Sequence, residues 1–249
     1  MARHAFIIGA QRSGTSYLGY ALSSNPLLCF AQPLFPEPKF FLNPDDFGKG
    51  KKYYYEKYFQ RASANSVCIE KSTSYFETPE AARRIANWFP DAAIIAVLRN
   101  PIHRAISNYY FSKANGLEKL DIIEAFNSEN ERTQNNQHTT SVSPFAYTQR
   151  GYYAKWLAIW RDLFPKTQIK LILFENMINS TESILHVAKS LLNEKGKITF
   201  TDAPINKGKC YKHNTVPSEL LKKLRKGFKD SVFELDRQWG IGAANRWGF

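Results

Sequence analysis

The sequence predicts an α/β fold in which a mostly parallel sheet is flanked by helices, and three observations support this. Short apolar runs alternate with helical patterns along the chain. The run within "DAAIIAVLRNP" (residues 91–101) is continuous, as expected for a strand buried on both faces of a parallel sheet. The first run, "HAFIIGA" (residues 4–10), breaks at a glycine loop that resembles a P-loop and leads into a helix.

The first half of the chain contains two strands, three helices and one irregular stretch. "TSYLGYALSSNP" has helical spacing up to Pro26, whereas the prolines that crowd residues 29–44 exclude a regular helix. We therefore expect a structured loop over residues 29–44. The remaining elements expected here are an amphipathic helix at 53–60, a strand at 66–72 and a helix at 78–90 with Pro79 near its start.

The second half continues the alternation. Pro101 begins a helix over residues 101–115, and a further helix (151–165) precedes the strand at 167–175. Between them, residues 117–149 are polar and weakly patterned, which indicates a surface insertion or a substrate-side loop. A chain of 249 residues has the length of one substantial domain, so we expect a single domain over residues 1–249.

Composition restricts the setting and the partners. The formal net charge of +12 favours anionic partners, which include nucleotides, acidic polymers and nucleic acids. No apolar run approaches the roughly 18 residues of a membrane span. The 3 cysteines lack CxxC spacing, and the histidines lack metal-ligand spacing. We therefore expect reduced thiols, no metal site and a cytoplasmic protein.

The loop "GAQRSGTS" (residues 9–16) has the frame of a phosphate-binding loop without its lysine. The position where P-loop nucleotidases carry lysine holds Thr15, and the nearby cation is Arg12, whose guanidinium can span two anionic oxygens. The third strand also ends in Arg99 rather than in an aspartate that would hold magnesium. These two differences argue against ATP hydrolysis.

Three loops follow the first three predicted strands, and each carries residues suited to anions. They are "GAQRSGTS", "EKSTSYF" and "LRNP". Ligands of open parallel sheets gather beyond the carboxyl ends of the strands, so we expect these loops to line one pocket.

In this order the three segments resemble the sulfotransferases that use 3′-phosphoadenosine 5′-phosphosulfate (PAPS). The similarity is closest to the glycosaminoglycan (heparan sulfate)-type and bacterial branch, and it spans about residues 5–230. The resemblance implies that the first loop binds the 5′-phosphosulfate and that Arg99 and Ser107 bind the 3′-phosphate. "NKGKCYKH" resembles the late loop that closes over the cofactor. The other implied cofactor-binding residues are Arg12, Ser13, Gly14, Thr15, Ser16, Lys207, Gly208 and Lys209.

The resemblance also implies catalytic residues. "PEPKFF" is similar to the loop that carries the catalytic glutamate, so Glu37 is the expected base, and Lys71 of "EKSTSYF" is expected near the transferred group. Thr73 stands where the family usually has proline. Glu70 is the rival carboxylate, and His103 is an alternative base because cytosolic members of the wider family use histidine.

The function expected from this resemblance is sulfuryl transfer from PAPS to a hydroxyl or amine. Glu37 would take the proton, Arg12 and Lys71 would offset charge on the bridging oxygen, and adenosine 3′,5′-bisphosphate would be the product. The expected partner is a saccharide or small-molecule acceptor, with no nucleic acid. Two alternatives stay open: a degenerate P-loop kinase or nucleotidase, and a non-catalytic module that binds polyanions through the basic late region.

Overall fold

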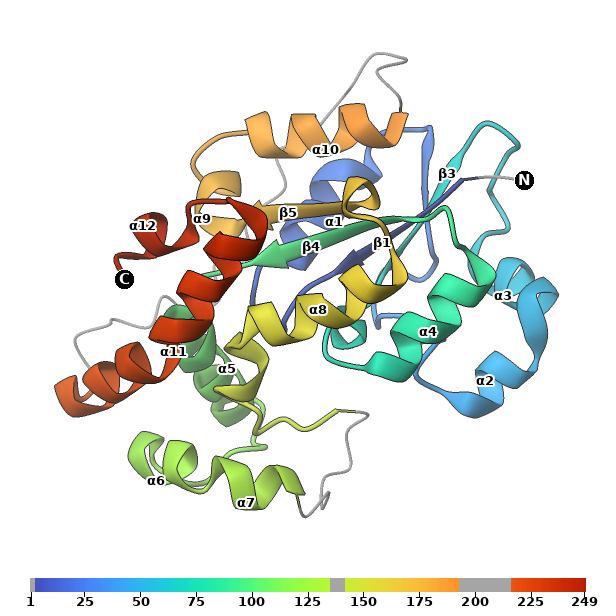
Figure 1. Ribbon diagram of the computed structural model, residues 1–249. Helices are drawn as coiled ribbons and strands as arrows, with labels where there is room; N and C mark the ends of the chain where they lie inside the picture. The colour runs from blue at the N-terminus through green and yellow to red at the C-terminus, as the bar shows by residue number, and fades with distance from the viewer. Residues whose placement is uncertain (1–2, 135–141, 193–215) are drawn as a thin grey trace. The chain divides into compact units, whose positions relative to one another are not determined.

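The computed structural model describes residues 3–134, 142–192 and 216–249 (Figure 1). The chain divides into two compact units. The sheet unit comprises Met1–Leu98 and Leu157–Asn206, and the helical unit comprises Arg99–Trp156 and Lys207–Phe249. The expectation of a single domain over residues 1–249 stays a prediction.

The sheet unit is built on five strands in the order β2-β3-β1-β4-β5. Every pair of neighbouring strands in this sheet is parallel, which confirms the predicted α/β class. The strands are β1 (Arg3–Ile8), β2 (Leu28–Phe30), β3 (Val67–Lys71), β4 (Ala93–Leu98) and β5 (Ile169–Leu173). Because the strands are parallel, their carboxyl ends share one edge of the sheet.

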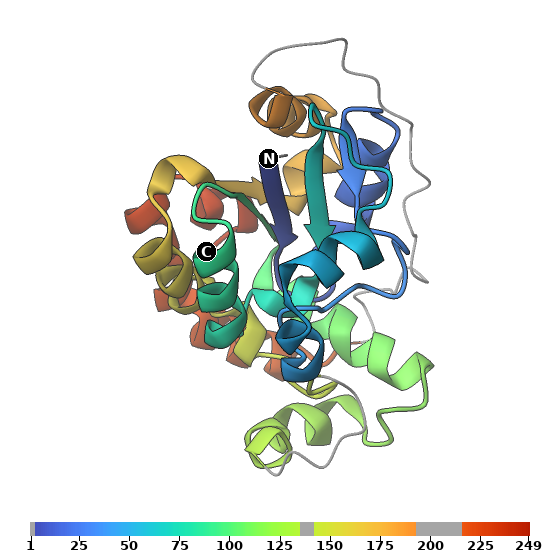
Figure 2. The same ribbon diagram turned by 90° about the vertical axis from the view of Figure 1, so that its right-hand side faces the viewer.

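Helices cover both faces of this sheet, and Figure 2 shows α1 and α4 on opposite sides of β1 and β3. Pro79 is the first residue of α4, as the sequence predicts. The helical elements of the unit are α1 (Thr15–Ser23), α2 (Pro44–Gly48), α3 (Gly50–Tyr58), η1 (Thr73–Tyr75), α4 (Pro79–Trp88), η3 (Lys166–Gln168), α9 (Phe174–Met177) and α10 (Glu182–Leu192). Helix α8 (Tyr153–Leu163) begins in the helical unit and ends in the sheet unit.

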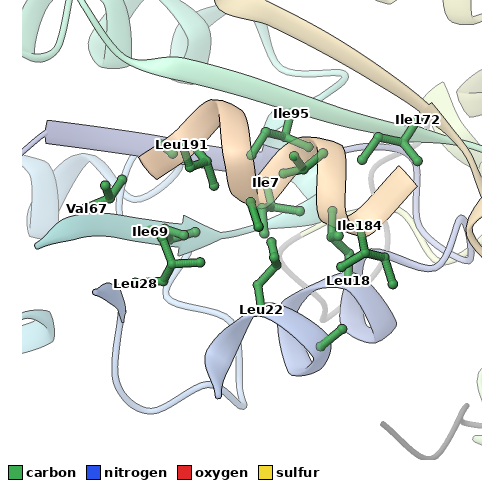
Figure 3. Close-up of a cluster of buried hydrophobic side chains, with 14 of the residues drawn as sticks. Ile7, Leu18, Leu22, Leu28, Val67, Ile69, Ile95, Ile172, Ile184 and Leu191 are labelled. Carbon is green, nitrogen blue, oxygen red and sulfur yellow. The ribbon is translucent and has the colours of Figure 1, made fainter. Parts of the chain in front are cut away.

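The two faces of the sheet are packed with different side chains. Aliphatic residues of α1, α10 and the strands form one core, drawn in Figure 3, in which Leu22 and Leu191 belong to the same cluster as Ile95. Aromatic rings fill the other face, where the ring of Phe41 lies 5.7 Å from that of Phe6 and 5.4 Å from that of Tyr54, measured between centroids. Both layers hold the strand ends rigidly, since these side chains are buried.

The structure adds a strand to the stretch 29–44, which the sequence predicts to be a loop. β2 runs from Leu28 to Phe30 and pairs with the edge of β3, with Leu28 opposite Val67. The rest of the stretch follows the prediction up to Asn43, whose side chain accepts the amides that begin α2. The added strand brings the start of this loop to the carboxyl edge of the sheet.

The helical unit consists of short helices around α5 and α11. Its elements are α5 (Pro101–Ala114), α6 (Ile122–Asn127), α7 (Glu129–Gln134), η2 (Gln149–Gly151), α11 (Ser218–Trp239) and α12 (Ala243–Trp247). Residues 117–134 are more ordered than their weak pattern indicates, because Asp121 and Glu124 form a capping box on α6. Buried Glu118 also pairs with Arg132 at 2.7 Å. None of the described helices is long and apolar enough to cross a membrane.

Candidate active site

The loop between β1 and α1 has a backbone that favours glycine at two positions. Gly9 has a φ of +140°, and a Cβ there would lie 2.4 Å from the carbonyl oxygen of Val97. Gly14 has a φ of +94°, and its Cβ would lie 2.4 Å from the ring of Phe174. Any side chain at either position would collide with these atoms, so the tight turn depends on glycine.

This loop carries several polar groups suited to an anion. Ser13 is fully buried, and its hydroxyl has no hydrogen-bond partner among the described residues. The first amides of α1, which begins at Thr15, have no acceptor within the helix and form its positive end. Arg12 adds a half-buried cation in the same loop. This combination suits a phosphate or sulfate group.

Glu37 and Lys71 form an ion pair at the carboxyl end of β3. The Nζ of Lys71 lies 2.6 Å from Oε1 of Glu37, with only 1% of the lysine side chain and 14% of the glutamate side chain exposed. The same Nζ donates to Oγ of Ser16 at 3.4 Å and lies 4.5 Å from the ring centre of Phe35. Lys71 therefore joins the phosphate-type loop to the loop that carries Glu37.

Thr73 holds the other oxygen of Glu37. Its backbone N–H and its hydroxyl both donate to Oε2, at 3.1 and 3.0 Å. A proline at position 73, the usual residue in the family that the sequence resembles, could donate neither hydrogen bond. With Lys71 on Oε1, these donors occupy three of the about four acceptor sites of the carboxylate and leave one to which these donors do not bond.

Glu70 lies on the opposite face of β3 and is fully buried. It accepts hydrogen bonds from the hydroxyls of Tyr54 (2.7 Å), Tyr75 (2.5 Å) and Ser72 (2.9 Å). Burial raises the pKa of this carboxyl to about 7, although the three hydroxyl donors lower it. Because Glu70 is fully buried and 14% of the Glu37 side chain is exposed, Glu37 is the more accessible of the two carboxylates.

Arg99 and Ser107 lie in the helical unit. Arg99 directly follows β4, and its carbonyl oxygen accepts a hydrogen bond from the hydroxyl of Tyr153 at 2.7 Å. Asn100 begins α5, because its side chain accepts two amides of the first helical turn. Ser107 is half-buried and lies in the second turn of this helix, so the two predicted 3′-phosphate ligands sit at fixed positions within one unit.

The predicted nucleotide-binding residues are thus distributed over both units, and their meeting in one pocket stays a prediction. Lys207, Gly208 and Lys209 lie outside the described residues. His103, the alternative base, is half-buried in the first turn of α5, within the helical unit. In the part of the chain that the structure describes, no cluster of three or more His, Cys, Asp or Glu side chains could hold a metal ion.

Sequence reasoning missed the polar residues that surround the two glutamates. Ser72 carries a signal, since it follows Glu70 by two positions and so belongs to the same face of an extended strand. From the sequence, Thr73 stands out only as a departure from a family pattern. The contacts of Tyr54 and Tyr75 with Glu70 depend on the packing of α3 and η1 against β3, which no local pattern indicates.

Comparison with protein families places this chain among known proteins. The profile of the sulfotransferase family matches residues 45–187. Among curated proteins, the mouse heparan sulfate glucosamine 3-O-sulfotransferase 3B1 is 29% identical over 242 residues, which cover 89% of this chain and 59% of the mouse protein. Its human counterpart is 31% identical over 83% of this chain and 50% of the human protein. The chain therefore spans about half the length of the curated relatives it matches.

Solved structures agree with these matches. A sulfotransferase from Alicyclobacillus acidocaldarius superimposes on this chain with a TM-score of 0.78 at 25% identity. The superposition covers 96% of each chain. Mouse sulfotransferase SULT7A1, solved with PAP, superimposes with a TM-score of 0.54 at 14% identity over 94% of this chain and 85% of the mouse chain. The similarity to the mouse enzyme, at 14% identity, shows a shared fold alone.

Proposed function

The chain belongs to the sulfotransferase family, and we propose that it transfers a sulfuryl group from PAPS to a hydroxyl or amine of an acceptor. The observation that carries the proposal is the Glu37–Lys71 ion pair at 2.6 Å. It places a carboxylate with a free acceptor site and a buried ammonium group side by side at the carboxyl edge of the sheet. A base and a cation at one position are what in-line transfer to a hydroxyl requires.

Glu37 acts as the base in this proposal. Lys71 and Thr73 hold its two oxygens in a fixed orientation, so the remaining lone pair points in one direction. When Glu37 takes the acceptor proton it becomes neutral and binds Lys71 less strongly. The ammonium group of Lys71 can then stabilise the oxygen on which negative charge accumulates as the S–O bond breaks.

The loop after β1 would hold the donor. PAPS supplies an activated sulfuryl group that needs no metal bridge, and the features of this loop fit its 5′-phosphate. The buried hydroxyl of Ser13 lacks a partner among the described residues, and the glycine turn leaves the first amides of α1 open to an anion. We assign Arg12, Ser13, Gly14, Thr15 and Ser16 to this group. We assign Arg99 and Ser107 to the 3′-phosphate. We assign residues 207–209 to the loop that closes over the cofactor.

The acceptor in this proposal is a saccharide or another small molecule. Two observations support a saccharide: the curated relatives named above are heparan sulfate sulfotransferases, and the net charge of +12 suits an acidic acceptor.

The direct experiment is transfer of radiolabelled sulfate from PAPS to panels of saccharides, phenols and amine-bearing metabolites. We expect label to appear in at least one acceptor and adenosine 3′,5′-bisphosphate to be released in equal amount. Arg99→Ala serves as the companion variant, since it should weaken donor binding. Absence of transfer to every panel, with the bisphosphate bound tightly, would restrict the proposal to nucleotide binding.

A thermal-shift comparison separates the two rival functions. Adenosine 3′,5′-bisphosphate should raise the melting temperature more than ATP with magnesium does, because Thr15 occupies the loop position at which nucleotidases carry the lysine for the γ-phosphate. A larger shift with ATP and magnesium would favour a kinase or nucleotidase. Binding of polyanions that survives loss of both Arg99 and Glu37, and that weakens steeply with salt, would favour the non-catalytic module.

A further inference from the structure

The backbone on the carboxyl side of Glu37 is held by two hydroxyls from the end of β3 and from η1. The amide of Lys39 donates to Oγ of Ser72 at 3.0 Å, and the amide of Phe41 donates to the hydroxyl of Tyr75 at 3.0 Å. Lys39 has a φ of +50°, a left-handed conformation that a residue other than glycine rarely adopts. Such a conformation persists only where surrounding contacts enforce it, and the bond to Ser72 is one of these contacts.

Both hydroxyls are oriented by Glu70. Ser72 and Tyr75 each donate their hydroxyl hydrogen to Oε1 of Glu70, at 2.9 and 2.5 Å. A hydroxyl has one hydrogen and two lone pairs, so a hydroxyl that donates to the carboxylate presents its lone pairs elsewhere. Those lone pairs accept the amides of Lys39 and Phe41. A buried carboxylate thereby converts two hydroxyls into acceptors for the loop of Glu37.

We propose that Glu70 is a positioning residue for sulfuryl transfer, acting through Ser72 and Tyr75 on the loop that carries Glu37. Glu70 is fully buried, so its effect on transfer passes through the residues that it bonds. Displacement of a catalytic base by about 1 Å can lower the rate by about 10²-fold. Loss of the contacts that Glu70 maintains should therefore be measurable as a lower rate of transfer. The kinetic part of the proposal depends on the sulfotransferase function proposed above.

The chain contains a matched control for this proposal. Tyr54 and Tyr75 are both fully buried tyrosines whose hydroxyls donate to Glu70. The hydroxyl of Tyr75 also accepts the amide of Phe41, whereas that of Tyr54, on α3, makes no hydrogen bond to residues 31–41 in the described chain. Replacing either tyrosine by phenylalanine removes one donor to Glu70. Only Tyr75→Phe also removes the acceptor of the Phe41 amide.

The test compares Tyr75→Phe, Tyr54→Phe and Glu70→Met in steady-state transfer and in calorimetric binding of adenosine 3′,5′-bisphosphate. We expect Tyr75→Phe and Glu70→Met to lower kcat by about 10-fold or more and to leave the nucleotide Kd within about 3-fold, whereas Tyr54→Phe keeps kcat within about 3-fold. Methionine removes both carboxylate oxygens, so the hydroxyls of Ser72 and Tyr75 lose the acceptor that orients them. Equal kcat values for the two tyrosine variants would overturn the proposal.

Amide hydrogen exchange supplies a readout that does not depend on activity. The amides of Lys39 and Phe41 should exchange faster in Glu70→Met, and that of Phe41 faster in Tyr75→Phe, while both keep their wild-type rates in Tyr54→Phe. Unchanged exchange at both amides in Glu70→Met contradicts the relay even if transfer is observed. If exchange responds as expected but the wild-type protein transfers no sulfate, the relay is supported and the proposed function is the part that fails.

Discussion

Two loops at the same edge of the sheet are shaped in opposite ways. The course of the loop at residues 9–14 depends on the absence of side chains, because a Cβ at Gly9 or Gly14 would collide with neighbouring atoms. The course of the loop at residues 31–41 depends on side chains that contact it, because Lys71, Ser72, Thr73 and Tyr75, which run from the end of β3 through η1, all bond to it. We infer that the first loop tolerates no change, whereas the second can be weakened one hydrogen bond at a time.

The largest effect should follow a change in the first loop. Gly9→Ala places a Cβ 2.4 Å from the backbone oxygen of Val97 at a φ of +140°. Backbone strain and overpacking together should lower the free energy of unfolding by about 2–5 kcal/mol, as measured by urea denaturation. Gly48→Ala is the matched control, since nothing lies within 4 Å of its Cβ, and it should change stability little. Equal effects of the two variants would show that the loop at residues 9–14 does not depend on glycine at position 9.

The second loop should respond most to loss of its cation. Lys71→Met removes the buried ammonium group from Oε1 of Glu37 and from Ser16. Transfer should fall by about 10²–10³-fold, the range found when one electrostatic donor to a transition state is removed. Lys52→Met, at a lysine whose side chain is 89% exposed, should keep the wild-type rate. Rates measured under saturating donor would show whether Lys71 contributes only through binding.

The buried anchor of the second loop predicts a stability that depends on pH. The pKa of Glu70 is raised from 4.5 to about 7 by burial, so the folded protein binds this proton more tightly than the unfolded chain does. Its stabilising contribution is therefore complete below about pH 4.5 and is lost as the pH rises through 7. Glutamine does not titrate, so the free energy of unfolding of wild type relative to Glu70→Gln should fall between pH 5 and 8.

The size of this change is up to about 3 kcal/mol if the pKa difference is fully expressed. The groups that face Glu70 are Tyr54, Tyr75 and Ser72, with the charge of Glu37 nearby, and burial raises the pKa of both tyrosines well above 10. The tyrosines therefore stay neutral across the range measured. Urea denaturation at four pH values checks the slope, and a constant difference between the two proteins would contradict it.

The smallest effects should come from Thr73. Thr73→Val removes the hydroxyl that donates to Glu37 at 3.0 Å and should lower turnover about 2–10-fold, in line with the loss of one hydrogen bond. Thr73→Pro removes the backbone donor as well and should lower turnover further. Proline is tolerated at the first position of a helix, which is where Thr73 lies in η1, so this variant should fold. A proline variant as active as wild type would show that these bonds do not orient Glu37.

The same contrast explains how much of the fold the sequence predicts. The turn at Gly9 and Gly14, the continuous strand β4 and the helices begun by Pro79 and Pro101 all depend on signals a few residues long, and the predicted elements match the structure there. The strand β2 has no such signal. It spans three residues beside a proline-rich stretch and exists because β3 pairs with it.

The candidate site also contains residues that sequence motifs predict and contacts that only tertiary packing creates. Glu37 and Lys71 were assigned from a resemblance to family motifs, and the structure places them in contact, although their roles stay predictions. The hydrogen bonds of Thr73 and the hydroxyls around Glu70 connect segments distant in the sequence, such as α3 and β3. Contacts of this kind depend on tertiary packing, so single-sequence patterns do not indicate them.

The most direct test of the account is single-turnover sulfate transfer by Glu37→Gln, measured together with the calorimetric Kd for adenosine 3′,5′-bisphosphate. The glutamine keeps the shape of the side chain and cannot take up the acceptor proton. The account predicts that transfer falls by about 10²–10⁴-fold while the Kd stays within a few-fold of wild type. Transfer within a few-fold of the wild-type rate would contradict the assignment of Glu37 as the base.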